Sequence, residues 1–78
     1  MSPTVFRYKN YRFFFFSREE SRMHIHVRSP EGEAKVWIEP QIELERSLGY
    51  NDSQVNEILE QVTEHRDEIE NHWRKHFS

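Results

Sequence analysis

The sequence predicts an α+β domain: an antiparallel β-meander of about four strands with one long C-terminal helix packed on one face. Residues 4–38 are rich in aromatic and β-branched side chains that alternate with polar ones, which is typical of strands. Residues 51–77 instead repeat apolar side chains at intervals of three and four, the period of an amphipathic helix. With 78 residues, the chain is near the smallest size that one hydrophobic core supports, so we expect residues 1–78 to form a single domain.

The first hairpin is expected from two aromatic-rich segments, Thr4–Tyr8 and Tyr11–Ser17. Lys9 and Asn10 lie between them and form a plausible two-residue loop, because Asn tolerates a left-handed backbone. This hairpin is followed by a polar stretch of mixed charge at residues 17–22, which we interpret as a solvated loop.

Four consecutive phenylalanines occupy the second of these strands. Neighbouring strand residues point to opposite faces, so Phe13 and Phe15 should oppose Phe14 and Phe16. The helix would cover one face. The other would be the interface of a homodimer, a docking patch for another protein or a surface for stacking, because contiguous exposed aromatic area is usually functional.

The second hairpin is predicted from strict alternation over Met23–Arg28, followed by a turn at Ser29–Gly32 in which Pro and Gly occupy favoured positions. A four-residue turn places the returning strand at Glu33–Ile38. One face of this hairpin is then wholly apolar, and a slip of one residue would mix the two faces. The expected cross-strand pairs are Met23 with Ile38, His24 with Trp37, Ile25 with Val36, His26 with Lys35, Val27 with Ala34, and Arg28 with Glu33.

The segment after this hairpin is ambiguous. Pro40 ends the strand because it lacks a backbone donor. Ile42 and Leu44 alternate with glutamates, so either a short edge strand or a turn of helix fits, and Gly49 then interrupts the chain.

The C-terminal helix has a clear start signal. Asn51 is a good N-cap, and Gln54 can complete a capping box. The apolar side chains expected to face the sheet are Val55, Ile58, Leu59, Val62, Ile69, Trp73 and Phe77.

Composition excludes several classes of protein. There is no cysteine, so disulfides and thiolate chemistry are excluded. The longest purely apolar run is Phe13–Phe16, so we expect no signal peptide and no membrane span, and a cytoplasmic location. The net charge of −3 is uneven: residues 1–36 hold seven Arg or Lys and four Glu, whereas residues 37–78 hold four and ten acidic residues. A mildly basic sheet suits an anionic ligand or a partner that carries both signs of charge.

Five segments of the chain resemble a family of small bacterial proteins of unknown function. These segments are Pro3–Arg7, Tyr11–Phe15, His24–Val27, Glu33–Trp37, and the helix end with Trp73 and Phe77. The chain departs from the family pattern at Met23, where Pro is usual, and at Asn10, where Gly is usual. The resemblance implies that the protein is one half of a toxin–antitoxin-like two-gene module, with a cognate small protein encoded nearby as its partner.

His24 and His26 are candidate metal ligands. Residues two apart on a strand are separated by roughly 6.5–7 Å, so both imidazoles can reach one ion, and His-x-His pairs recur in catalytic zinc sites. His72 and His76 have i, i+4 spacing on the helix. The helix should cover the sheet face opposite His24 and His26, so one combined site is not expected.

The same sheet face also suits two functions without a metal or other cofactor. His24 and His26 could transfer protons while Arg12 stabilises a phosphate transition state, as in a metal-independent ribonuclease. Arg28, Lys35 and Trp37 would instead form a binding surface for single-stranded RNA or for a protein. We therefore expect a component of a toxin–antitoxin-like module that acts on RNA or on its cognate protein. The alternatives are a non-catalytic protein-interaction module and a His-x-His metal-binding protein.

Overall fold

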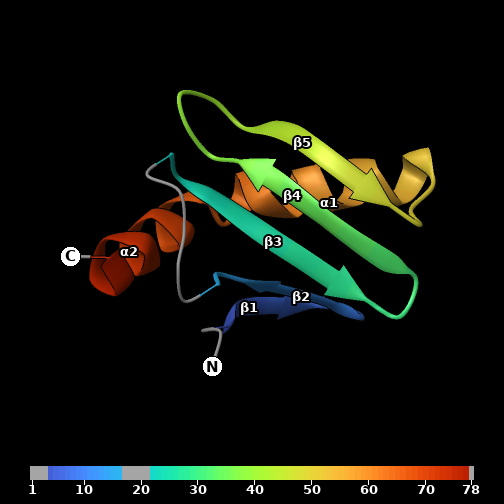
Figure 1. The fold of residues 1–78 in the computed structure, drawn as a ribbon, viewed down its shortest axis with the longest axis horizontal. Helices are drawn as coiled ribbons and strands as arrows, with labels where there is room; N and C mark the ends of the chain where they lie inside the picture. Colours follow the sequence, from blue (N-terminus) through green and yellow to red (C-terminus); the bar gives the residue numbers. More distant parts are fainter. Residues whose placement is uncertain (1–3, 17–21, 78) are drawn as a thin grey trace.

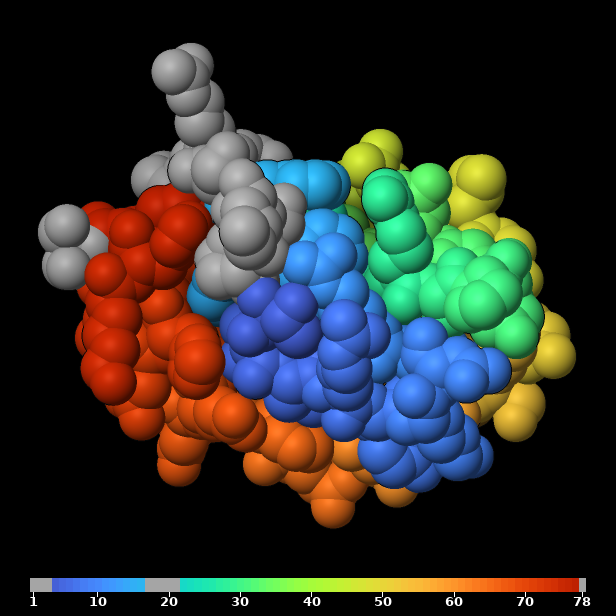
Figure 2. Space-filling model, turned by 90° about the horizontal axis from the view of Figure 1, so that it is seen from below, coloured from blue at the N-terminus to red at the C-terminus, as the bar shows by residue number. Residues whose placement is uncertain are grey.

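A computed structural model describes residues 4–16 and 22–77 and confirms the α+β class (Figure 1). Its five-stranded antiparallel sheet has the order β1-β2-β3-β4-β5, so each strand pairs with its neighbour in sequence. The helices form a second layer against one face of the sheet (Figure 2). The elements are β1 (Thr4–Tyr8), β2 (Tyr11–Phe14), β3 (His24–Ser29), β4 (Gly32–Trp37), β5 (Glu43–Leu48), α1 (Asp52–Glu64) and α2 (Arg66–Phe77).

The first hairpin forms with Tyr8 opposite Tyr11, as expected. Its left-handed residue is Lys9, with φ of 52°, and not Asn10. Strand β2 ends at Phe14, earlier than predicted. Residues 17–21, for which we expected a solvated loop, lie outside the described residues.

The second hairpin has the predicted register. His24 lies opposite Trp37 and Arg28 opposite Glu33, with the expected pairs between them. Beyond the strand ends, the backbone nitrogen of Ile38 donates a 2.9 Å hydrogen bond to the carbonyl of Met23. Alternation of apolar and polar side chains was therefore sufficient to predict this register.

The prediction of about four strands is wrong because residues 43–48 form a fifth strand, β5, at the edge of the sheet. The strand interpretation of this ambiguous segment is the correct one. Leu44 lies opposite Val36 and packs against the core, which supplies the apolar contact that favours a strand here. A register shift between Lys35 and Val36 interrupts the pairing of β4 with β5.

The prediction of one long helix is also wrong, because a turn at His65 divides it into α1 and α2. The apolar stripe has a gap between Val62 and Ile69, so the middle of the helix lacks a large aliphatic anchor. The His65 ring instead stacks on Phe6 of β1, with ring centroids 3.8 Å apart. The predicted capping box of Asn51 and Gln54 is present. Neither described helix combines the length and apolar character needed to cross a membrane.

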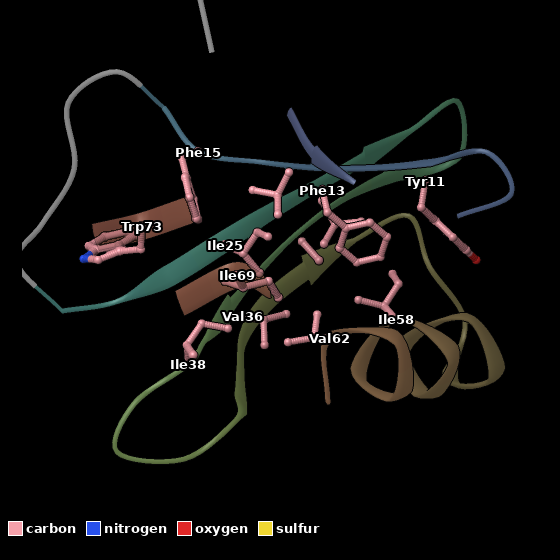
Figure 3. Packing of buried hydrophobic residues seen from close by; sticks show 13 residues of the cluster. Tyr11, Phe13, Phe15, Ile25, Val36, Ile38, Ile58, Val62, Ile69 and Trp73 are labelled. Atoms are coloured by element: carbon pink, nitrogen blue, oxygen red, sulfur yellow. The ribbon is translucent and has the colours of Figure 1, made fainter. Parts of the chain in front are cut away.

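The core lies between the sheet and the two helices (Figure 3). Phe13 and Phe15 are at most 1% exposed and belong to this core, whereas Phe14 and Phe16 contact each other outside it. The predicted division of the four phenylalanines is thus confirmed. The core residues are Val5, Tyr11, Phe13, Phe15, Ile25, Val27, Ala34, Val36, Ile38, Ile58, Val62, Ile69 and Trp73.

Two glycines allow the start of β4 to approach the end of β5 closely. A Cβ atom on Gly32 would lie 1.9 Å from the carbonyl oxygen of Leu48. Gly49 has φ of +87°, and a Cβ there would lie 2.2 Å from the carbonyl oxygen of Glu31. Both obstacles are backbone atoms, which cannot rotate away as a flexible side chain could.

We expect Gly32→Ala to lower the free energy of unfolding by about 1–3 kcal/mol, because β4 and β5 must separate to admit the methyl group. Urea denaturation monitored by circular dichroism measures this change. Glu45→Ala, at an exposed position of the same sheet edge, is the control and should change stability by at most about 0.5 kcal/mol. Equal stability of the two variants would contradict the close approach.

Candidate functional site

The sheet face opposite the helices, here called the outer face, carries all the residues predicted to form a site. Cross-strand pairing arranges its side chains in three rows, from β1 towards β5. The first row consists of Arg7, Arg12, Arg28, Glu33 and Leu48, and thus begins with three arginines on neighbouring strands. The second row consists of Phe14, His26, Lys35 and Arg46. The third row consists of His24, Trp37 and Glu43.

The two strand histidines are buried, although they lie on the sheet face opposite the one that the helix was expected to cover. His24 is 0% exposed and His26 is 8% exposed. The His24 ring lies 5.5 Å from Trp37 and 5.3 Å from Trp73 of α2, between centroids. Its Nδ1 atom lies 2.7 Å from the carbonyl oxygen of Arg22, within hydrogen-bonding distance.

We expected the helix to pack only on the inner face of the sheet. The structure differs, because one helix residue also reaches a side chain of the outer face. Trp73 of α2 also contacts Phe15, which follows the end of β2 (Figure 3). Because the same indole contacts His24, α2 packs around the end of the sheet. Alternation along a strand assigns a face, but it does not show which helix residue reaches past the strand's end.

The metal prediction has only two of the ligands it needs. The rings of His24 and His26 are adjacent, with centroids 5.0 Å apart. Within residues 4–16 and 22–77, no group of three or more His, Cys, Asp or Glu could hold a metal ion. His72 and His76 are exposed on α2, where the His76 ring lies 6.2 Å from Phe15. A zinc site with three protein ligands is therefore not assembled by the described residues.

Arginines cover the Phe14 ring on the outer face. The Arg12 guanidinium lies 4.5 Å from the ring centroid, and its Nε atom donates a 2.7 Å hydrogen bond to Thr4 Oγ1. The guanidinium of Arg28 lies 5.9 Å from the same centroid and forms a 3.7 Å ion pair with Glu33. Phe16 and His26 also contact the ring, with centroids 5.4 and 5.8 Å away, and Phe14 is 2% exposed.

Trp37 is covered in a similar way. The Arg22 guanidinium lies 4.1 Å from the indole centroid, and the Lys35 ammonium lies 4.5 Å from it. Lys35 is only 9% exposed. These cation–π contacts stabilise the cations against the rings. Trp37 is half-buried, and these two cations occupy part of its ring surface.

A groove crosses the outer face over β3 and β4. Its volume is about 220 Å³, and its walls come from the end of β2 and from β5. The lining residues are Phe14, Phe16, His26, Val27, Arg28, Glu33, Ala34, Arg46, Ser47 and Leu48.

The predicted site contained no residue of β5, whereas Arg46, Ser47 and Leu48 line the groove. Strict alternation would put Leu48 on the same side as Leu44, in the core. The register shift in β5 instead places Leu44 opposite Val36 and Leu48 opposite Glu33, so Leu48 faces outward. A bulge of this kind leaves no distinct mark in the sequence.

The resolved pKa shifts lie away from this groove, mainly where the first hairpin meets α1. The Lys9 ammonium donates a 2.7 Å hydrogen bond to the Glu57 carboxylate. This contact lowers the pKa of Glu57 below the usual value for a glutamate and raises the pKa of Lys9 above the usual value for a lysine. Burial, reinforced by Glu57, raises the pKa of Tyr11. These contacts tie the hairpin to the helix and serve the fold.

Fold and surface together define a small α+β domain whose β-meander is covered by helices on one side and is basic on the other. Residues 10–74 match the model of a domain of unknown function, DUF4160, and the chain belongs to this family. The expected membership of a family of unknown function is thereby confirmed. No curated protein and no solved structure matches the chain.

Proposed function

We propose that this protein is the binding component of a bacterial toxin–antitoxin-like two-gene module and acts in the cytoplasm without chemistry of its own. Its outer face would bind an anionic surface of a macromolecular partner. The two-gene setting follows from the family resemblance of the five sequence segments. The binding role is supported by the groove, in which Arg28 and Arg46 lie beside exposed apolar side chains.

Burial of His24 argues against the ribonuclease alternative. A general acid or base must come within hydrogen-bonding reach of the proton that it transfers. His24 is fully buried against Trp37 and Trp73, and its Nδ1 atom faces a backbone carbonyl. We therefore assign His24 a packing role.

RNA is the second candidate ligand, and the arginine row supports it. Arg7, Arg12 and Arg28 lie side by side on three neighbouring strands. Like charges placed directly opposite each other destabilise a sheet, and phosphates bound along the row would relieve that repulsion. RNA is therefore included in the test below.

We expect the double variant Arg28→Glu/Arg46→Glu to bind its partner at least about 30-fold more weakly, since about 2 kcal/mol is typical for the loss of a buried interfacial charge pair. The measurement has two arms. One is co-purification with the co-expressed product of the neighbouring gene, after nuclease treatment. The other is fluorescence polarisation of labelled poly(U) RNA.

The matched control is Arg66→Glu/Arg74→Glu, which makes the same change of charge on α2. It should bind like the unmodified protein in both arms. Unchanged binding by the outer-face variant, or an equal loss by the control, would contradict the proposed surface. RNA cleavage that disappears in a folded His26→Gln variant would restore the ribonuclease alternative.

A further inference from the structure

The groove on the outer face is flanked by the two most exposed large apolar side chains of the described residues. Phe16 is 39% exposed and Leu48 is 68% exposed. Phe16 follows β2 and Leu48 ends β5, so they lie on opposite walls, with β3 and β4 between them. One exposed apolar side chain on each wall favours an apolar side chain as the occupant of the groove between them.

The size of the groove favours a side chain over a cofactor. Small-molecule sites usually enclose about 300–1,000 Å³. This groove, at about 220 Å³, is smaller and open along the sheet. A segment of chain that lies across it and inserts one apolar residue would fill it.

The positive charge of the groove favours acidic residues next to the inserted apolar residue. Arg28 and Arg46 line the groove, and Glu33 is the one acidic residue among the lining residues that the structure describes. Glu33 also lies 3.7 Å from Arg28 in an ion pair. A guanidinium group can donate two parallel hydrogen bonds to one carboxylate in a planar geometry. Acidic residues on either side of the inserted apolar residue would therefore complement Arg28 and Arg46.

The covered rings make nucleic acid a poorer match for this groove. Sequence-tolerant binding of single strands depends on bases stacking on open aromatic faces. Phe14 is 2% exposed beneath Arg12, and Trp37 carries Arg22 and Lys35 on its indole. Phe16 alone of the groove's two phenylalanines presents substantial exposed area.

We propose that the groove takes an extended segment of a partner protein in which an apolar residue is flanked by aspartate or glutamate. The apolar side chain packs between Phe16 and Leu48, and the carboxylates pair with Arg28 and Arg46. This inference rests on the proposed binding function of the outer face and specifies the chemistry of its partner.

Selection from a random dodecapeptide display library on the full-length protein tests this chemistry. We expect the enriched peptides to place Leu, Ile, Met or Phe within a few residues of Asp or Glu. Fluorescence polarisation of a selected peptide should show binding about tenfold weaker or worse for Leu48→Ala and for Arg46→Glu. Arg74→Glu, an exposed charge reversal on α2, is the control and should bind normally.

Each other outcome overturns the inference in a distinct way. Enriched peptides that lack acidic residues would contradict the proposed chemistry. Peptides that bind the Leu48→Ala and Arg46→Glu variants as tightly as the unmodified protein would show that this groove is not the peptide site. Absence of enriched peptides together with poly(U) binding that Arg28→Glu/Arg46→Glu removes would leave the outer-face function standing with RNA as its ligand. Absence of both, together with no co-purification of the neighbouring gene's product, would also refute the proposed function.

Discussion

Replacing Phe13 by alanine is expected to lower the free energy of unfolding by about 3–5 kcal/mol, the usual effect of removing a buried ring. Phe13 is 0% exposed, and its ring stacks on Phe6 with centroids 4.2 Å apart. The cavity would open in the middle of the core, between the sheet and α1 (Figure 3). Urea denaturation followed by circular dichroism measures the loss.

Phe16→Ala is the matched control because it removes the same ring from the same run of phenylalanines. Phe16 is 39% exposed on the outer face, so its loss should destabilise the fold far less. Similar destabilisation by the two substitutions would contradict the assignment of alternate phenylalanines to opposite faces.

Trp73→Ala should also destabilise the protein by about 3–5 kcal/mol. Its indole is 9% exposed and contacts two rings that are far from Trp73 in the chain, Phe15 after β2 and His24 at the start of β3. Removal of the indole should expose the His24 ring to solvent. Thermal and urea denaturation give the change in stability, and the NMR signals of His24 report its exposure.

Trp73→Phe distinguishes loss of ring packing from a general effect at this position. It keeps an aromatic ring against Phe15 and should retain much of the stability and the burial of His24. A Trp73→Ala variant as stable as the unmodified protein would mean that α2 does not hold the end of the sheet.

The second hairpin shows how far local pattern can determine a fold. Its register follows from alternation and a four-residue turn, both of which involve residues close in sequence. The N-cap of α1 was predictable for the same reason, because Asn51 and Gln54 satisfy backbone groups within one turn.

Features that depend on distant contacts were not predictable. At the turn between the helices, the His65 ring stacks on Phe6, and 59 positions separate these two residues in the chain. The burial of His24 depends on Trp73, from the last helix. In both cases the deciding partner lies on another element, and periodicity within one element contains no information about it.

The candidate site was predicted in part for the same reason. Alternation placed Arg12, Arg28 and Lys35 on one face, and the structure puts them there. It did not reveal the wall formed by Arg46 and Leu48, because the register shift in β5 reverses the expected sides. Adding β5 turns a flat basic face into a groove.

The strand order has a consequence for how the chain folds. Every strand of the sheet pairs with the strand beside it in sequence, so each hairpin closes only a short loop. Proteins dominated by such local contacts have low contact order and fold quickly for their size. Contacts between residues far apart in sequence form at the C-terminal end of the chain. Glu57 of α1 pairs with Lys9 in the turn after β1, and His65, between the two helices, stacks on Phe6 of β1. We expect the hairpins to form first, with docking of the helices completing the core and setting the folding rate.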